Sequence, residues 1–320
     1  MVIDQDNLAQ HTNIWMRRKP GPCVMLSTRP LLTAVSGPIL ALVNRIDRIF
    51  DRASGTDRRS GKVLMPFITA GDPDLDTTAL LLPALESAGA SIVELGIPFS
   101  DPIADGSVIQ ASMMHALDRG IHVDQIFERV AGVRSRIEIG LVAMVSYSIV
   151  HRIGSASFIR DATAAGFDGF IFPDLPLDES NLIRDLVADT GGILSMLIAP
   201  TTPEDRAGRI AKASSGFIYV LSRAGVTGER AQLPTGLYGR LSRLRASTDK
   251  PLAVGFGISN PQQVAHVAEV ADAVIVGSAL MRQVDDNRKK GPDAIVQSVT
   301  TLTRQLADGL HGTTDSHTVT

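Results

Sequence analysis

Cysteine is almost absent from this chain, since Cys23 is the only one among its 320 residues. A single cysteine excludes an internal disulfide framework and a multi-cysteine zinc site. The seven histidines form no His-Glu-x-x-His pair or comparable ligand spacing, so we expect no metal. Aromatic residues make up only 4% of the chain, which argues against the stacking platforms of nucleic-acid-binding proteins.

An excess of charge of either sign is also lacking. The formal net charge is −3, so nothing attracts the chain to nucleic acid or to an anionic membrane. No uninterrupted apolar run approaches the roughly 20 residues that a membrane helix needs. A hydrophobic content of 44% nevertheless allows a sizeable core. These features predict a globular protein, and the near absence of cysteine suits a reducing compartment, so we expect the protein in the cytoplasm.

Residues 1–43 differ from the rest of the chain. No acidic residue occurs between Asn7 and Asn44, and four prolines in this stretch interrupt any helix. Three interpretations stay open: a flexible extension, an upstream start assigned in error, or a transit peptide that would direct the protein to an organelle. We predict a leader-like extension over 1–43, one domain over 44–309 and a disordered tail over 310–320.

Strand and helix patterns alternate along the predicted domain. Eight short apolar runs, rich in β-branched residues, are typical of buried strands, and each is followed by a helical pattern. The runs are 64–70, 91–97, 140–145, 169–174, 193–199, 216–222, 251–257 and 273–279. Eight such repeats over about 250 residues predict a single-domain α/β fold, the closed (β/α)8 TIM barrel. A doubly wound open sheet is the alternative, but it usually has fewer strands.

One carboxylate, Glu94, lies inside the second apolar run, where an unpaired charge would cost several kcal/mol. The run ends in a loop that carries Asp101 and Asp105. Because a barrel presents its chemistry at the carboxyl ends of its strands, these groups are candidates for acid–base catalysis. Alternatives stay open for each. Glu94 either pairs with a basic residue or has a raised pKa, and the aspartates either react or only stabilise turns.

Three glycine-bearing segments, 224–228, 255–259 and 277–279, accompany the last three predicted strands. Glycine lets backbone N–H groups approach an anion closely, and a helix N-terminus favours negative charge. Loops after strands seven and eight of such barrels often bind phosphate. Each segment alone is also explained as an ordinary turn, but together they predict a phosphate site. Neither a P-loop nor a complete dinucleotide-binding fingerprint is present.

Four motifs resemble the tryptophan synthase α subunit family: PFITAGDP at 66–73, ELGIPFSDPIADG at 94–106, LSRAGVTG at 221–228 and GFGIS at 255–259. Their order and spacing hold from about residue 45 to residue 285. The resemblance implies a lyase that cleaves indole-3-glycerol phosphate into indole and glyceraldehyde 3-phosphate during tryptophan biosynthesis. It implies no cofactor on this chain, and pyridoxal phosphate only on a partner β subunit in an α2β2-type assembly.

The resemblance also implies roles for individual residues. Glu94 matches the acid–base residue of the family, and Asp105 matches the carboxylate that hydrogen-bonds the indole N–H. The remaining matches contact the substrate: Phe67 at the indole, Tyr219 in the pocket wall, Thr227 in a closing loop, and Gly228, Gly257, Gly277 and Ser278 at the phosphate.

Two stretches depart from the family pattern. Ser-Tyr-Ser-Ile at 146–149 replaces a stretch that usually reads close to Tyr-Tyr-Asn-Pro, and Ser107 stands where proline is usual. By the family pattern, both stretches lie near the partner-facing rim or the edge of the pocket. They therefore affect the expected coupling to a β subunit more than the expected lyase reaction. A free-standing lyase that releases indole is therefore an alternative. A non-catalytic partner that activates a β subunit is another, although the presence of both Glu94 and Asp105 argues against it.

Overall fold

The computed structural model describes residues 43–53, 61–101, 105–222 and 236–310. The predicted extension over 1–43 and tail over 310–320 lie almost wholly outside these ranges, so both boundaries stay predictions. No helix within the described ranges combines the length and the apolar character needed to cross a membrane.

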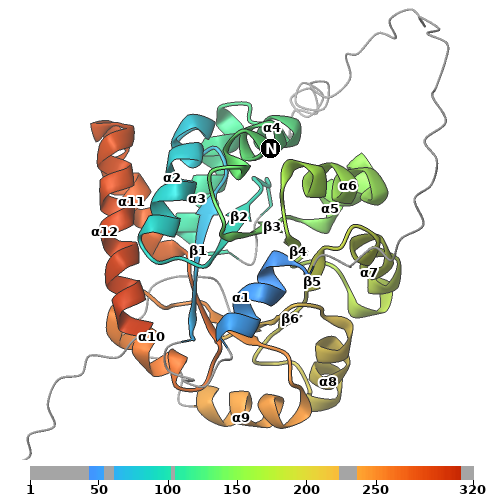
Figure 1. Ribbon diagram of the computed structural model, residues 1–320. Helices are drawn as coiled ribbons and strands as arrows, with labels where there is room; N and C mark the ends of the chain where they lie inside the picture. The colour runs from blue at the N-terminus through green and yellow to red at the C-terminus, as the bar shows by residue number, and fades with distance from the viewer. Residues whose placement is uncertain (1–42, 54–60, 102–104, 223–235, 311–320) are drawn as a thin grey trace, which may run out of the picture. The chain divides into compact units, whose positions relative to one another are not determined.

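Among the described residues, nine parallel strands form one sheet at the centre of the fold (Figure 1). They are β1 (Val63–Thr69), β2 (Ile92–Gly96), β3 (Gly140–Met144), β4 (Gly169–Ile171), β5 (Ile193–Ser195), β6 (Leu197–Ile198), β7 (Ile218–Leu221), β8 (Leu252–Gly255) and β9 (Ala273–Val276). Only Met196 separates β5 from β6, so these two are a single strand position. Because β5 pairs with β4 and β6 pairs with β7, this position closes the circle. The predicted (β/α)8 barrel is confirmed.

Helices surround the sheet (Figure 1). They are α1 (Arg45–Ala53), α2 (Leu75–Ser87), α3 (Ser107–Asp118), α4 (Val123–Arg134), α5 (Tyr147–Ile153), α6 (Ser155–Ala165), α7 (Ser180–Asp189), α8 (Glu204–Ala213), α9 (Leu237–Ser247), α10 (Pro261–Ala268), α11 (Ser278–Asn287) and α12 (Pro292–Leu310), with 3-10 turns η2 (Leu177–Glu179) and η3 (Arg288–Lys290). The helical patterns that follow the third and the last predicted strands lie at 154–165 and about 293–308, in α6 and α12, so the sequence patterns missed α5 and α11. The last predicted strand, 273–279, is therefore too long, because α11 begins at Ser278.

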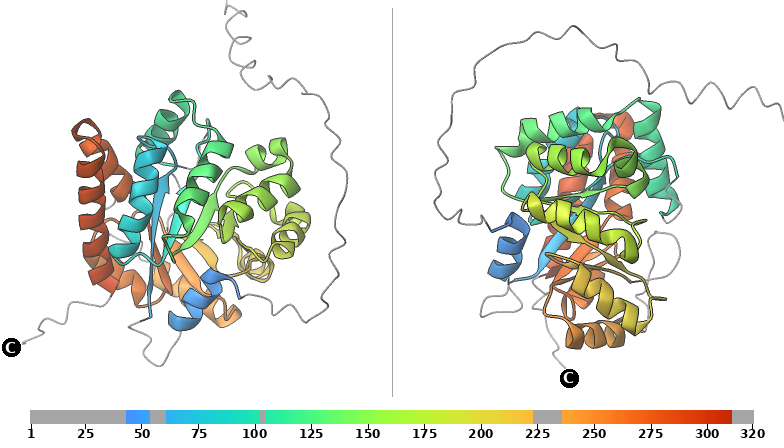
Figure 2. Two further views of the ribbon diagram at one scale, coloured as in Figure 1. Left: turned by 45° about the horizontal axis from the view of Figure 1, so that its top comes forward. Right: turned by 90° about the vertical axis from the view of Figure 1, so that its right-hand side faces the viewer.

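Two apolar cores fill the fold, one between the sheet and its helices and one inside the barrel. Strand residues are buried on both faces, which explains their nearly continuous apolar runs. Helix α1 covers one end of the barrel, visible below the strands in the left view of Figure 2. Its Ile46 and Phe50 belong to the inner core, and the Phe50 ring lies 5.9 Å from that of Phe217.

Strand geometry places Glu94 inside the barrel. Side chains alternate between the two faces of a strand, so Glu94 points inward like Ile92, which belongs to the inner core. The parallel register sets Glu94 beside Phe67 of β1 and Val142 of β3. A polar side chain at this position therefore faces the barrel lumen above the apolar layers.

Polar contacts to Asp168 hold α1 against the barrel. The Asp168 carboxylate accepts hydrogen bonds from Arg45 at 2.7 Å and from Arg134 at 2.9 Å. The Asn44 side chain donates to the backbone carbonyls of Asp168 and Gly191, both at 2.8 Å. Because Asp168 precedes β4, these bonds anchor α1 at the amino ends of the strands, opposite the active-site end of a barrel.

We expect Asp168→Ala to destabilise the fold without abolishing function. The substitution removes the carboxylate that accepts from two partly buried guanidinium groups and from the Leu141 backbone N–H, which costs about 2 kcal/mol. Urea unfolding measures the loss. Asp161→Ala is the control, since its ion pair with Arg160 is exposed and is worth less than about 1 kcal/mol. Equal losses in the two variants would contradict an anchoring role for Asp168.

Candidate active site

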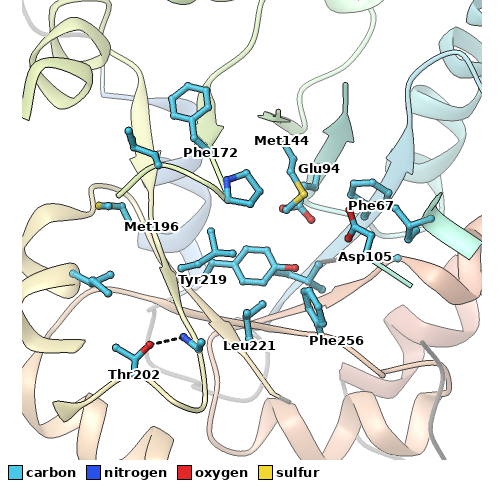
Figure 3. Close-up of a pocket in the computed structure, with 18 of the residues that line it drawn as sticks. Phe67, Glu94, Asp105, Met144, Phe172, Met196, Thr202, Tyr219, Leu221 and Phe256 are labelled. Carbon is cyan, nitrogen blue, oxygen red and sulfur yellow. Dashed lines mark hydrogen bonds between the residues drawn. The ribbon is translucent and has the colours of Figure 1, made fainter. Parts of the chain in front are cut away.

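A cavity of about 350 Å3 opens among the carboxyl ends of the strands and the loops that follow them (Figure 3). This volume is within the range of small-molecule sites. Every predicted site residue that the structure describes lines it: Phe67, Glu94, Asp105, Tyr219, Gly257, Gly277 and Ser278. Thr227 and Gly228 lie outside the described residues. The fold thus brings together residues that are up to 211 positions apart, from Phe67 to Ser278.

The Glu94 carboxyl group has no partner within the described part of the chain. The residue is fully buried, and neither carboxylate oxygen makes a hydrogen bond there. Burial raises the pKa of Glu94 to about 8, and the negative charge of Asp105 contributes further. Of the two sequence-based alternatives, the structure favours the raised pKa over pairing with a basic residue. At neutral pH this carboxyl group retains a proton.

Asp105 is the loop carboxylate that reaches the cavity. Its backbone carbonyl accepts a 2.8 Å hydrogen bond from the Gln110 side chain on α3, which fixes its place before the helix. Burial raises the pKa of Asp105 to about 6, so this group is mostly ionised at neutral pH. Asp101, in contrast, is exposed and accepts a hydrogen bond from the hydroxyl of Ser100. The turn-stabilising explanation therefore fits Asp101 and not Asp105.

Tyr219 projects from β7 into the middle of the cavity (Figure 3). Its hydroxyl points toward the side on which Glu94 and Asp105 lie. Burial raises the pKa of Tyr219, and the negative charges of Glu94 and Asp105 raise it further, so the phenol stays protonated. Two carboxyl groups and one phenol thus share a chamber whose other walls are mainly apolar.

Two glycines provide room for the aromatic rings of the cavity. A Cβ atom at Gly96 would lie 2.5 Å from Cζ of Phe67, and one at Gly255 would lie 2.7 Å from Oη of Tyr219. Both distances are too short for any side chain, so strand ends β2 and β8 require glycine. The close approach of the aromatic rings therefore explains why glycine occurs at these positions of the sequence motifs at 94–106 and 255–259.

Gly257, Gly277 and Ser278 form the end of the cavity at which the sequence predicts phosphate. Gly277 precedes α11 and has no side chain to cap it, so N–H groups of the first helical turn remain available to a ligand. A helix N-terminus with free N–H groups favours an anion. The unpredicted helix α11 therefore supplies a feature that the glycine pattern alone did not reveal.

Several cavity residues were missed by sequence reasoning. Met144, Phe172, Leu197, Phe256 and Ile275 complete the apolar wall. Met144 could have been found, because it lies two residues after the inward-facing Val142 and pairs in register with Gly96. Phe172 falls inside the predicted strand 169–174, but β4 ends at Ile171, so strand alternation does not give the direction of its side chain.

Asp174 explains the local structure of the atypical stretch at 146–149. Its carboxylate accepts hydrogen bonds from the Ser146 hydroxyl and from the Tyr147 backbone N–H, both at 2.7 Å. Ser146 in turn caps α5 by accepting from the N–H of Ser148. This stretch thus forms the ordered start of a helix whose first residues are tied to the loop after β4.

No group of three or more metal-binding side chains occurs within the described ranges. The fold and the cavity define a (β/α)8-barrel enzyme whose buried carboxyl groups are suited to proton transfer. The family model described as "Tryptophan synthase alpha chain" matches residues 54–311, which is most of the chain. The chain belongs to the tryptophan synthase alpha chain family, a family of lyases.

Individual relatives agree with this assignment. The tryptophan synthase alpha chain of Rhodopirellula baltica is 42% identical over 269 residues, which cover 83% of this chain and 96% of that protein. The corresponding protein of Chloroflexus aggregans is 44% identical over 266 residues, covering 82% and 97%.

Solved structures show the same fold. Tryptophan synthase subunit alpha from Legionella pneumophila has a TM-score of 0.75 at 33% identity, covering 83% of this chain and 98% of that chain. A chain from the Pyrococcus furiosus tryptophan synthase complex has a TM-score of 0.71 at 34% identity, covering 77% and 98%.

We expect stability to fall as the pH rises from about 4.5 to about 8. Glu94 keeps its proton in the folded state up to about pH 8, whereas its ordinary pKa is 4.5. The folded state then binds more protons than the unfolded state across this window, so the free energy of unfolding decreases with rising pH. Glu94→Gln removes this titration. The free energy of unfolding of the variant should therefore increase relative to that of the native chain as the pH rises from about 4.5 to about 8.

Urea unfolding between pH 4.5 and pH 9 measures this effect. Glu128→Gln, an exposed change on α4, is the matched control and should track the native chain at every pH. If the free energies of unfolding of Glu94→Gln and the native chain differ by a constant amount from pH 4.5 to pH 9, the pKa of Glu94 is not raised in the folded state.

Proposed function

We propose that this chain cleaves indole-3-glycerol phosphate into indole and glyceraldehyde 3-phosphate. The observation that carries the proposal is the buried Glu94 carboxyl, which has no partner among the described residues and faces a mainly apolar chamber together with Asp105. Membership of the tryptophan synthase alpha chain family supports the same retro-aldol reaction and its place in tryptophan biosynthesis.

The different pKa values of the two carboxyl groups support different roles for them. Glu94, with a pKa of about 8, holds a proton at neutral pH and delivers it to indole carbon C3. Asp105, with a pKa of about 6, is ionised and accepts a hydrogen bond from the indole N–H, which stabilises the positive charge that develops on the ring.

The same Glu94 group completes the cleavage. After giving its proton to C3, the Glu94 carboxylate takes the proton of the glycerol hydroxyl next to the ring. The bond between C3 and the glycerol carbon then breaks, its electron pair returns to the indole, and the hydroxyl carbon becomes the aldehyde. One proton is given and one is recovered, so Glu94 is ready for another cycle.

The remaining cavity residues position the substrate. Phe67 and Tyr219 are proposed to flank the indole, since both rings lie beside the carboxyl groups (Figure 3). Gly257, Gly277 and Ser278 are proposed to hold the phosphate through backbone N–H groups and the N-terminus of α11. The family motif adds Thr227 and Gly228 to this phosphate site.

We propose further that the chain acts in the cytoplasm with a β subunit in an α2β2-type assembly. The structural similarity to a chain of the Pyrococcus furiosus complex supports such a partner. On this proposal the chain itself needs no cofactor, and pyridoxal phosphate resides on the β subunit. A free-standing lyase is the second candidate, favoured by the altered stretch at 146–149, whose start Asp174 holds through hydrogen bonds.

Glu94→Gln should lower kcat for indole release by at least about a thousandfold, because glutamine cannot transfer the proton. Asp105→Asn should lower kcat by about a hundredfold, because it no longer neutralises the charge on the indole ring. Binding of glycerol 3-phosphate should be retained in both, since the phosphate end is unchanged. Glu128→Gln should behave like the native chain, and near-native turnover in Glu94→Gln would disprove the acid–base role.

Addition of a β subunit from the same family should raise the rate of indole release by the purified chain. The expected result is slow cleavage alone and at least about tenfold faster cleavage with the partner, because a partner contact that closes the site excludes water. Fast cleavage that the partner does not change would favour the free-standing lyase. No cleavage under either condition would contradict the proposed reaction.

A further inference from the structure

The backbone is strained at the phosphate end of the cavity. Phe256 has a φ of +81°, and within the described ranges it is the only residue other than glycine with a positive φ. This conformation is disfavoured for an L residue and persists only where surrounding contacts enforce it. The next residue, Gly257, has the same φ of +81°. Two such residues in succession turn the chain sharply at the end of β8.

Ser222 makes the contact that holds this turn. The residue is buried directly after β7, and its hydroxyl donates a 2.5 Å hydrogen bond to the backbone carbonyl of Phe256. Its backbone N–H donates to the carbonyl of Gly255 at 3.0 Å. Ser222 is itself held in place, because the Arg240 side chain donates to the carbonyl of the preceding Leu221. One serine therefore binds two consecutive carbonyls of the neighbouring strand end.

The hydrogen bond from Ser222 to the Phe256 carbonyl also determines the direction of the Gly257 N–H. The peptide bond between Phe256 and Gly257 is trans, and in a planar trans peptide the C=O and N–H groups point in opposite directions. When the Phe256 carbonyl points at Ser222, the Gly257 N–H points away from Ser222. Gly257 lines the cavity, and its N–H makes no hydrogen bond to any other described residue.

We propose that Ser222 is a positioning residue for phosphate binding. It fixes the peptide between Phe256 and Gly257 so that the Gly257 N–H points at the anion in the cavity. The same bond keeps the Phe256 ring edge-on to Tyr219, with ring centres 6.5 Å apart. The inference deepens the proposed function and rests on it, because it assumes that the cavity binds a phosphate ester.

The experiment compares Ser222→Ala with Ser214→Ala. Ser214 is equally buried, at 3% exposure like Ser222, and also donates to a backbone carbonyl, but it lies before β7 at the opposite end of the strand. Calorimetry measures the Kd of glycerol 3-phosphate and of indole, and unfolding measures stability. Ser222→Ala should raise the Kd of glycerol 3-phosphate about tenfold, which is the effect expected from the loss of one hydrogen bond. The Kd of indole should change less than about twofold.

Ser214→Ala should lower stability and leave the Kd of glycerol 3-phosphate unchanged, because its hydroxyl contacts Ile210 and Met196 and not the residues of the proposed phosphate end. Ser222→Thr, which keeps the hydroxyl, should restore native affinity for glycerol 3-phosphate. If Ser222→Ala does not fold, Ser222→Cys, of nearly the same volume but a weaker donor, takes its place and should also lose affinity. Equal losses for indole and glycerol 3-phosphate, or no loss, would overturn the proposal.

Turnover separates this proposal from the proposed function. In Ser222→Ala the KM for indole-3-glycerol phosphate should rise about tenfold with kcat nearly constant, since phosphate binding contributes equally to the ground state and the transition state. If the native chain binds glycerol 3-phosphate but cleaves no substrate, the lyase proposal is refuted. The Kd values of the Ser222 variants then test the role of Ser222 by themselves. A native chain that cleaves, with an unchanged KM in Ser222→Ala, would refute only the role of Ser222.

Discussion

A carboxyl group buried without a hydrogen-bond partner among the described residues is the constraint on which the site depends. Glu94 lies inside the barrel, where ionisation costs several kcal/mol. The group avoids most of this cost by keeping its proton to about pH 8, and that proton is what acid catalysis needs. The barrel must remain stable although it buries the Glu94 carboxyl group. Its inner and outer cores and the anchoring of α1 through Asp168 provide the compensating stability.

The same constraint explains how the cavity can accept an anionic substrate. A lysine or arginine beside Glu94 would lower its pKa and remove the proton. At the proposed phosphate end the described lining offers backbone N–H groups and a helix N-terminus instead, around Gly257 and Ser278. Arg206 is the one basic residue of the described lining. It lies on α8, the helix that follows Thr202, and Thr202 is on the opposite side of the cavity from Glu94 (Figure 3).

Much of the fold could be predicted because parallel strands are buried on both faces. Runs such as 140–145 are then apolar without interruption and stand out from the amphipathic helices between them. Helix α11 was missed because the segment after β9 was read as a continuation of the strand and its turn. Helix α5 was missed because the stretch at 146–149 was compared with a family motif, whereas its helical start depends on Asp174, which is distant in sequence.

The sequence by itself determined the barrel, the family and the identity of the two carboxyl residues, since these depend on periodicity and on motifs that are continuous along the chain. It could not determine whether Asp105 lies in the cavity or only stabilises a turn, whether Glu94 has a basic partner, or which side chain contacts the Phe256 carbonyl. Each of these depends on side chains from different strands that meet only when the sheet closes. Burial, and with it the pKa of Glu94 and of Asp105, is a property of that closed arrangement and not of any segment.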